Sequence, residues 1–297
     1  MSVDAITTPP LSVVMPVLNA ARMIDEALAS AAEFVDCEII VVDGGSTDGT
    51  PDLVRRHRQA RLISAPGTSI YQALNIAILD TRAPLIAWLN ADDLLLPGAA
   101  QAAVAAFEAA PDADIVRGQA QFVASDEAGW GGHDRLSEQR TAGPLRLDLV
   151  TRGPLAVNTM FFRRSLFDNV GLFDESLRLA ADREWMLRAW LAGIEIREIP
   201  DPVYRYRIHA GSSTLDPRRR NYRVVRAEHD AILRRYLPVA LRRRPDDPFR
   251  RELRRWHAVE YALRLNGLIG NGALWPVVRL VGAGVRTLRS ARMPPAA

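Results

Sequence analysis

Lysine is absent from this 297-residue sequence, and cysteine occurs only once. A single cysteine excludes an intrachain disulfide framework and a zinc site built from cysteine ligands, and it fits a reducing cytoplasm. We expect Cys37 to be a small buried thiol beside the second strand, because thiols are among the most buried groups in proteins.

Long hydrophobic runs are lacking as well. A membrane-spanning helix needs roughly 18 or more apolar residues, whereas the best candidate, residues 273–285, is shorter and contains Arg279. The N-terminus shows no basic start followed by a long apolar segment, which is the pattern of a secretory signal. We therefore expect a cytoplasmic protein that is soluble or peripheral on the inner face of the membrane.

Two phosphate-binding motifs are also missing. The sequence contains neither the G-x-x-x-x-G-K loop of many kinases nor the G-x-G-x-x-G pattern of dinucleotide-binding folds. Kinase and dehydrogenase interpretations are correspondingly weak.

The formal charge of +3 conceals an unequal distribution. Residues 1–200 hold 17 arginines against 27 acidic residues, whereas residues 201–297 hold 21 arginines against 8. Such asymmetry indicates a basic surface for phosphates, anionic lipid or nucleic acid. Two interpretations stay open: helices that lie on an anionic membrane near a lipid-linked acceptor, or a charged face packed on the rest of the protein or on a partner subunit. Nucleic acid is not an expected partner, because no recognised reader motif accompanies the arginines.

What is present is an alternation of apolar strands with amphipathic helical stretches. With 48% hydrophobic residues, the chain can bury a large core. The alternation predicts an α/β fold, with a mostly parallel central sheet and helices on both faces. Strands are expected at residues 11–15, 38–42, 61–64, 84–90 and 113–118, and helices at residues 21–34, 50–59, 68–81 and 97–110.

In the second half of the chain, the regular alternation of predicted strands and helices ends. The polar, glycine-bearing segment from Ser125 to Gly143 predicts a loop over the site. A strand is expected at residues 158–164, a helix at 181–193, and two short strands at 194–199 and 202–209. Beyond Pro217 the chain is predicted to be helical and arginine-rich, with breaks at Pro238, Pro245, Pro248 and Pro276.

Polar side chains directly follow two of the predicted buried strands. Asp43 ends one strand and is expected to be an exposed carboxylate, and Asn90, Asp92 and Asp93 follow another. In open α/β sheets, ligands bind outside the carboxyl ends of the strands. Oxygen ligands converging there suit Mg²⁺ or Mn²⁺, and such a metal suits a diphosphate. Alternatively, Asp92 and Asp93 only begin the helix that follows Pro97.

Four motifs in chain order, LSVVMPVLNA, VVDGGSTDGT, SIYQALNIAI and LNADD, resemble those of the family 2 glycosyltransferases, which have the GT-A fold. The resemblance covers roughly residues 10–215. It implies transfer of a sugar from a nucleotide-diphosphate donor to a saccharide or lipid-linked acceptor hydroxyl with inversion, in the synthesis of a cell-surface polysaccharide or glycolipid.

The resemblance also implies a domain organisation. Residues 1–215 would form the GT-A catalytic domain, with a nucleotide-binding half at 10–118 and an acceptor half at 119–215. Residues 216–297 would form a basic helical C-terminal extension.

The resemblance assigns a nucleotide-binding role to residues on the first four motifs. In this assignment Asp43 accepts the N–H of a pyrimidine base, and Gly44 and Gly45 let the backbone approach the nucleoside. Ser46 has the alternative role of capping the next helix, in competition with Asp48 and Thr50. The nucleotide-binding residues are Pro16, Val17, Asn19, Asp43, Gly44, Asn75, Asn90 and Asp92.

The metal site is expected around LNADD and the later segment VYRYRIHAGSST. Asn90 stands where the family has the first aspartate of its metal-binding D-x-D motif, and Asp92 carries the metal. Asp93 is a second ligand or a helix-cap residue, and His209 is a metal ligand or a diphosphate contact. Arg205 or Arg207 would neutralise phosphate charge.

An inverting displacement also needs a carboxylate that takes the proton of the acceptor. LAADREWMLRAW, residues 179–190, resembles the start of a family helix, and the base position falls on Asp182. Glu184 is the second candidate base, and Asp182 could instead cap the helix. The remaining alternatives are a nucleotidyltransferase of similar fold and a protein that binds nucleotide sugars or nucleic acid without catalysis.

Overall fold

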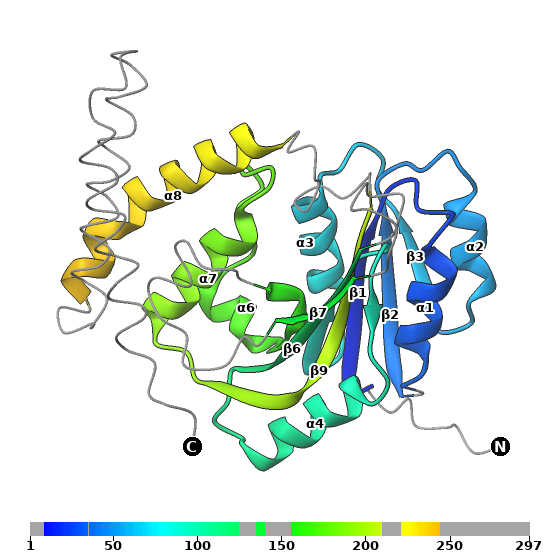
Figure 1. The fold of residues 1–297 in the computed structure, drawn as a ribbon, viewed down its shortest axis with the longest axis horizontal. Helices are drawn as coiled ribbons and strands as arrows, with labels where there is room; N and C mark the ends of the chain where they lie inside the picture. Colours follow the sequence, from blue (N-terminus) through cyan, green and yellow to red (C-terminus); the bar gives the residue numbers. More distant parts are fainter. Residues whose placement is uncertain (1–8, 35, 125–134, 140–155, 210–220, 244–297) are drawn as a thin grey trace.

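The structure, a computed structural model, describes residues 9–34, 36–124, 135–139, 156–209 and 221–243. These residues form a mixed sheet flanked by helices (Figure 1). The strands are β1 (Leu11–Val17), β2 (Cys37–Asp43), β3 (Ala60–Ser64), β4 (Leu85–Trp88), β5 (Leu94–Leu95), β6 (Ile115–Ala124), β7 (Arg135–Gln139), β8 (Met160–Arg163) and β9 (Ile196–Ile208). The helices are α1 (Ile24–Ala32), α2 (Thr50–Arg56), α3 (Ile70–Asp80), α4 (Ala99–Ala109), α6 (Ser165–Val170), α7 (Ala181–Ala192), α8 (Tyr222–Arg243) and the short 3-10 helix η2 (Val157–Thr159).

The first half of the sheet is parallel, as the alternating pattern predicts. The strand order is β3-β2-β1-β4-β8-β6-β9-β5, with β7 paired to β6. β1 pairs in parallel with both β2 and β4, and β2 pairs in parallel with β3. All residues of β4 are buried, and β1 and β2 are almost completely buried, as is usual for parallel strands covered on both faces.

The second half of the sheet is mixed rather than mostly parallel. β8 lies between β4 and β6 and runs antiparallel to both, while β6 runs parallel to β9. The two short strands expected at 194–199 and 202–209 are one strand, β9. Its register with β6 shifts near Pro202, because a proline cannot donate to the ladder of hydrogen bonds.

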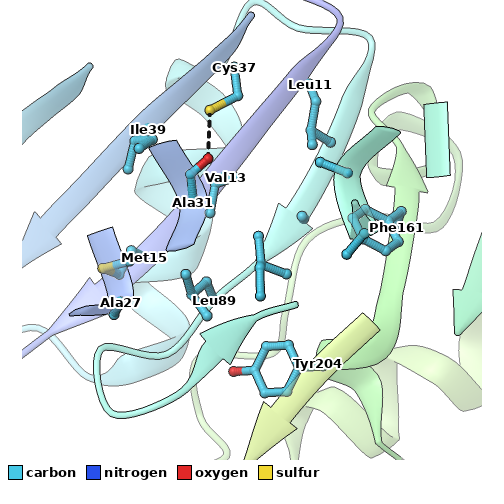
Figure 2. Close-up of a cluster of buried hydrophobic side chains, with 14 of the residues drawn as sticks. Leu11, Val13, Met15, Ala27, Ala31, Cys37, Ile39, Leu89, Phe161 and Tyr204 are labelled. Atoms are coloured by element: carbon cyan, nitrogen blue, oxygen red, sulfur yellow. Dashed lines mark hydrogen bonds between the residues drawn. The ribbon is translucent and has the colours of Figure 1, made fainter. Parts of the chain in front are cut away.

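Two hydrophobic clusters fill the two faces of the sheet. In β2, Ile39 and Val41 point towards α1, α2 and α4, whereas Ile40 and Val42 point towards α3, α6 and α7. Figure 2 shows part of the first cluster. There the buried Cys37 thiol donates to the carbonyl oxygen of Ala31 over 3.2 Å, and burial raises its pKa to about 11. The expectation of a buried thiol is confirmed.

Further elements differ from the sequence-based expectations. The loop predicted from Ser125 to Gly143 contains β7, and neither β5 nor α6 was predicted. Pro238 lies inside α8 instead of ending a helix; the breaks predicted at Pro245, Pro248 and Pro276 lie outside the described residues.

Helix α8 packs on α7 at the side of the molecule away from β3 (Figure 1). Ile232 and Leu233 are buried, and Ile232 belongs to the same hydrophobic cluster as α7. The described part of the basic C-terminal region is therefore packed on the protein. None of the helices in the described segments is long and apolar enough to cross a membrane.

Candidate active site

The loops after β1 and β2 are hydrogen-bonded to each other at the carboxyl edge of the sheet. The backbone N–H of Gly44 donates to the carbonyl of Val17 over 2.9 Å. Asn19 lies in the left-handed region with a φ of 52°, its N–H donates to Ser46 Oγ, and its Oδ1 accepts from the N–H of Thr47. The two loops thus form one preorganised edge.

Asp43 is buried, so the expectation of an exposed carboxylate is wrong. Only 4% of the residue is exposed. Its oxygens accept hydrogen bonds from the N–H groups of Gly45 and Ser46 and from the Ser46 hydroxyl. The carboxylate therefore shapes the turn in which Gly45 has a φ of +102°. Recognition of a base by Asp43 stays a prediction.

The other predicted residues of this edge have different exposures. Pro16 is partly exposed within β1, whereas the Val17 side chain is buried in the cluster beneath α1. Ser46 does not cap α2, whose N-cap position is Gly49 with no side-chain hydrogen bond. Asp48 instead accepts from the N–H and hydroxyl of Thr50.

Asn90 begins the turn that follows β4, and the protein already uses its amide. Its Oδ1 accepts from the indole N–H of Trp88 over 2.8 Å, and its Nδ2 donates to Asp93 over 3.1 Å. Its backbone N–H donates to the Tyr204 hydroxyl. These bonds fix the turn that carries Asp92, and contact of Asn90 with a ribose stays a prediction.

Asp93 is buried and connects β9 to this turn. Its carboxylate accepts from Asn90, from the Tyr204 hydroxyl over 2.9 Å and from the N–H of Arg207 over 2.9 Å. Burial, followed by the neighbouring charge of Asp92, raises the pKa of Asp93 to about 7. To ligate a metal, Asp93 would have to give up these bonds, so the structure favours a role in holding β9.

Asp92 and His209 lie together, although 117 residues separate them in the chain. The His209 Nε2 is 3.0 Å from Asp92 Oδ2, and the two side chains are 20% and 33% exposed. A carboxylate oxygen and an imidazole nitrogen are a donor set that suits Mn²⁺. Among the described residues no group of three or more His, Cys, Asp or Glu side chains could hold a metal, so this pair would share a metal with oxygen atoms from elsewhere.

The two arginines expected to meet a phosphate are engaged within the protein. Arg207 donates to the carbonyl oxygen of Asp92 and forms an ion pair with Glu26 on α1. Arg205 donates to Oε1 of Gln121 on β6. Both guanidinium groups therefore position β9, which His209 directly follows.

Asp182 lies in the first turn of α7 and does not cap it, because no side chain caps this helix and its N-cap residue is Ala180. Asp182 Oδ1 accepts from the Tyr71 hydroxyl over 3.2 Å and from the N–H of Arg183 over 2.8 Å. Burial raises the pKa of Asp182 above its usual value. A carboxylate with a raised pKa is a better base near neutral pH.

Glu184, the second candidate base, is buried and paired. Its carboxylate accepts from Arg188 at 2.9 and 3.0 Å and from the hydroxyl of Tyr236 on α8. Arg188 also donates to the carbonyl groups of Val170 and Leu172. Glu184 thus connects α7, α8 and the segment before α7, and Asp182 is the candidate base that the geometry favours.

Asn75 was predicted to bind the nucleotide, but its side chain is buried in the protein. Both hydrogens of its Nδ2 are used, in bonds to the Phe173 carbonyl and to Glu175, and its Oδ1 accepts from the N–H of Phe173. Asn75 belongs to the face of α3 that packs on the core. It holds the segment that leads to α7, and therefore to Asp182.

Aromatic rings connect the candidate base with the turn after β4. The Tyr71 ring lies 6.3 Å from Trp88 and 5.7 Å from Phe173, and the Trp88 indole bonds to Asn90. The sequence analysis missed Tyr204, whose hydroxyl joins Asn90 to Asp93. The alternation of tyrosine and arginine at residues 204–207 could have indicated it, because alternate residues of a strand share one face of the sheet.

The mixed sheet flanked by helices defines an α/β protein, and its polar groups gather at the carboxyl edge of the parallel strands, where ligands bind in open α/β sheets. Residues 12–171 match the model of the family described as Glycosyl transferase family 2. Because this match covers more than half of the chain, the chain belongs to glycosyltransferase family 2 and is a glycosyltransferase.

Two relatives have names that indicate a role. A "PGL/p-HBAD biosynthesis glycosyltransferase" of Mycobacterium bovis (strain BCG / Pasteur 1173P2) is 30% identical over 191 residues, which are 61% of this chain and 70% of the relative. The "Succinoglycan biosynthesis protein ExoU" of Rhizobium meliloti (strain 1021) is 28% identical over 208 residues, 63% of this chain and 58% of that protein.

A solved structure shares the fold. The mannosyltransferase PcManGT from Pyrobaculum calidifontis, in complex with GDP-Man and Mn²⁺, matches with a TM-score of 0.58 over 94% of this chain and 80% of that chain. The sequence identity is 20%, so the likeness concerns the fold alone.

Proposed function

We propose that this glycosyltransferase moves a sugar from a nucleotide-diphosphate sugar to an acceptor hydroxyl with inversion and with the help of a divalent metal. The names of the relatives support a product that is a cell-surface polysaccharide or glycolipid. The GDP-Man and Mn²⁺ bound by the mannosyltransferase of the same fold support the donor type and the metal.

The observation that carries the proposal is a path of contacts between two chemically different groups. Asp182 bonds to Tyr71, whose ring lies against Trp88. Trp88 bonds to Asn90, which begins the turn that carries Asp92. A candidate base and a candidate metal ligand are therefore held on one connected framework, as a displacement at a bound donor requires.

The chemistry of the transfer assigns a role to each group. Asp182 takes the proton of the acceptor hydroxyl while the acceptor oxygen forms a bond to the anomeric carbon of the sugar. The bond between that carbon and the diphosphate oxygen breaks, and the nucleoside diphosphate leaves from the opposite face. Asp92 and His209 would hold a metal that, when bound, offsets the negative charge of the leaving diphosphate.

Two readouts test the proposal. In thermal denaturation with UDP, GDP, dTDP and CDP, we expect one diphosphate to raise the Tm, in a manner that needs Mn²⁺ and is lost in Asp92→Ala. In a transfer assay, Asp182→Asn is expected to keep this binding and lose turnover. Asp52→Asn is a matched control, because Asp52 is exposed and forms an ion pair with the neighbouring Arg55 on α2, away from the proposed site.

Normal turnover by Asp182→Asn would overturn its role as the base. Binding of a diphosphate by wild type without any transfer, across a panel of acceptors, would favour a binding protein of this fold. The stereochemistry of the product, read by NMR of the anomeric proton, tests inversion directly.

The location at the inner face of the membrane is a separate part of the proposal. The described part of the C-terminal region packs on α7, so docking on lipid would use the arginine-rich residues beyond α8. Flotation of the full chain with anionic liposomes at low salt tests this, and failure to float would contradict it.

A further inference from the structure

Asn158 lies at the same edge of the sheet as the turn that carries Asp92, although no motif pointed to it. It belongs to η2, directly before β8. β8 runs antiparallel to β4, with Phe161 opposite Ala87. Because the two strands are antiparallel, the start of β8, and with it η2, lies at the edge of the sheet where β4 ends and the turn with Asn90 begins.

The side-chain amide of Asn158 is only half satisfied. Its Oδ1 accepts a hydrogen bond from the Tyr206 hydroxyl over 3.2 Å. Its Nδ2 is buried, and it is the one buried side-chain nitrogen or oxygen without a partner among the described residues. A buried donor without an acceptor costs free energy, so its presence needs an explanation.

The neighbours of Asn158 keep the amide in place. Tyr206 stacks on Phe122, with ring centroids 4.8 Å apart and planes 8° apart, and its ring lies 4.7 Å from that of Tyr204. Tyr204 in turn bonds to Asp93. A tyrosine held in this way directs its hydroxyl to Asn158 Oδ1 and leaves Nδ2 as the free donor.

The Asn158–Tyr206 pair is connected to both ends of the proposed site. Tyr206 is adjacent to Arg207, which bonds to the turn at Asp92. On the other side, Val157, which precedes Asn158, belongs to the same hydrophobic cluster as Tyr71 and Ala181. Tyr71 bonds to the proposed base, Asp182, and Ala181 precedes it in the chain.

We infer that Asn158 Nδ2 donates a hydrogen bond to a hydroxyl oxygen of the sugar that is transferred. This inference rests on the proposed function, since that function places the sugar between the diphosphate and the acceptor. A neutral carboxamide suits a hydroxyl oxygen, whereas phosphate oxygens are usually met by cations. A site that offers a buried donor to a substrate hydroxyl discriminates strongly against substrates that lack it.

The test compares Asn158→Leu with wild type, because leucine has a similar size and no donor. Affinities for GDP, GDP-mannose, UDP and UDP-glucose are measured by calorimetry, with Mn²⁺. We expect wild type to bind one of the two nucleotide sugars more tightly than the nucleoside diphosphate that it contains. In Asn158→Leu this advantage is lost, affinity for the diphosphate is unchanged, and kcat/KM for transfer falls about 100-fold, as for loss of a buried hydrogen-bond donor.

The Tm separates this role from a structural one. Asn158→Leu also removes the acceptor of the Tyr206 hydroxyl, so it is added to Tyr206→Phe, which has already lost that bond. Since Nδ2 has no partner in the free protein, Asn158→Leu is not expected to lower the Tm in this background, whereas loss of a structural bond of Nδ2 would. Tyr206→Phe, which removes only the hydroxyl that orients the amide, should reduce kcat/KM by a smaller factor.

Three outcomes would overturn the inference. In the first, Asn158→Leu still binds the nucleotide sugar more tightly than the nucleoside diphosphate, by the same factor as wild type. In the second, Asn158→Leu loses affinity equally for both ligands, and in the third, wild type itself does not bind the nucleotide sugar more tightly. Asp182→Asn assayed in parallel keeps the two hypotheses apart. If Asp182→Asn is inactive and Asn158→Leu is fully active, the proposed function stands and only the role of Asn158 is wrong.

Discussion

The hydroxyl of Tyr71 on α3 donates a hydrogen bond to Oδ1 of Asp182 on α7, across 3.2 Å and 111 residues of sequence. The bond joins the third motif of the sequence to the candidate base. It stabilises the ionised carboxylate and so opposes the effect of burial on the pKa of Asp182.

Tyr71→Phe is therefore expected to move the pH dependence of transfer. Without the hydroxyl, the pKa of Asp182 rises further, and a larger fraction of the base is protonated at a given pH. The acidic limb of the kcat/KM profile should shift to higher pH, with little change at alkaline pH. An unchanged profile would contradict Asp182 as the group that must be ionised.

The Tm of Asp182→Asn is expected to increase relative to that of wild type as the pH rises. Burial raises the folded-state pKa of Asp182 above its usual 3.8. The stabilisation from this group is present at low pH, where it is protonated, and is lost as the pH rises through the folded-state pKa. Asparagine does not ionise, so the Tm difference between variant and wild type should increase from pH 4 to pH 7.

Asp52→Asn is the control for this measurement, because Asp52 is exposed on α2. Its Tm difference should change little over the same pH range. A Tm of Asp182→Asn that falls relative to wild type as the pH rises would show that the carboxylate stabilises the fold.

Glu228→Ala is expected to loosen the segment that precedes the candidate base. The carboxylate of Glu228, on α8, accepts hydrogen bonds from the N–H groups of Arg178 and Leu179 over 2.7 and 2.8 Å. We expect a loss of about 1–3 kcal/mol in the free energy of unfolding. Hydrogen exchange should become faster at these two amides, and kcat should fall.

Two variants of α8 calibrate that result. Glu228→Gln keeps one acceptor oxygen and should have an intermediate effect, while Arg234→Ala changes an exposed residue of the same helix and should have almost none. Equal effects of all three substitutions would mean that the helix contributes through its general packing.

Gly118→Ala is expected to destabilise the pairing of β6 with β9. A Cβ at position 118 would lie 2.4 Å from both methyl groups of Val203, which is buried and has a stiff, β-branched side chain. The expected cost is about 1–3 kcal/mol in chemical denaturation. Adding Val203→Ala should cost less in the Gly118→Ala background than in wild type, and purely additive effects would contradict the clash.

The sequence predicted the parallel half of the sheet well, because each β-α unit there is local and each apolar run is covered on both faces. It did not predict that β8 inserts between β4 and β6, since antiparallel pairing between distant strands leaves no local signal. β9 was divided in two because Pro200 and Pro202 resemble a break, although the strand continues through an irregular register.

For the site, the motifs predicted a metal site around Asp92 and His209, and the structure brings these two side chains together. Their roles, and that of Asp182 as the base, stay predictions. The motifs did not show which side chains the protein itself engages: Asp43 is bonded by its own turn, Asp93 by Tyr204, and Asn75 by the Phe173 segment. Motif spacing shows which residues reach an edge of the sheet, but not which of their oxygens and nitrogens remain available to a ligand. Asn158 was missed for the converse reason, since only the packed structure reveals an unsatisfied amide.

The Glu228 contact has a practical consequence for protein engineering. A fragment cut after His209 would keep every proposed ligand-binding side chain and yet release the amides of Arg178 and Leu179. It would also leave Glu184 without Tyr236 and expose the apolar side of α7 that Ile232 covers. Exchanging C-terminal regions between relatives would fail for the same reason, unless the acceptor for these two amides is carried along with the new helix.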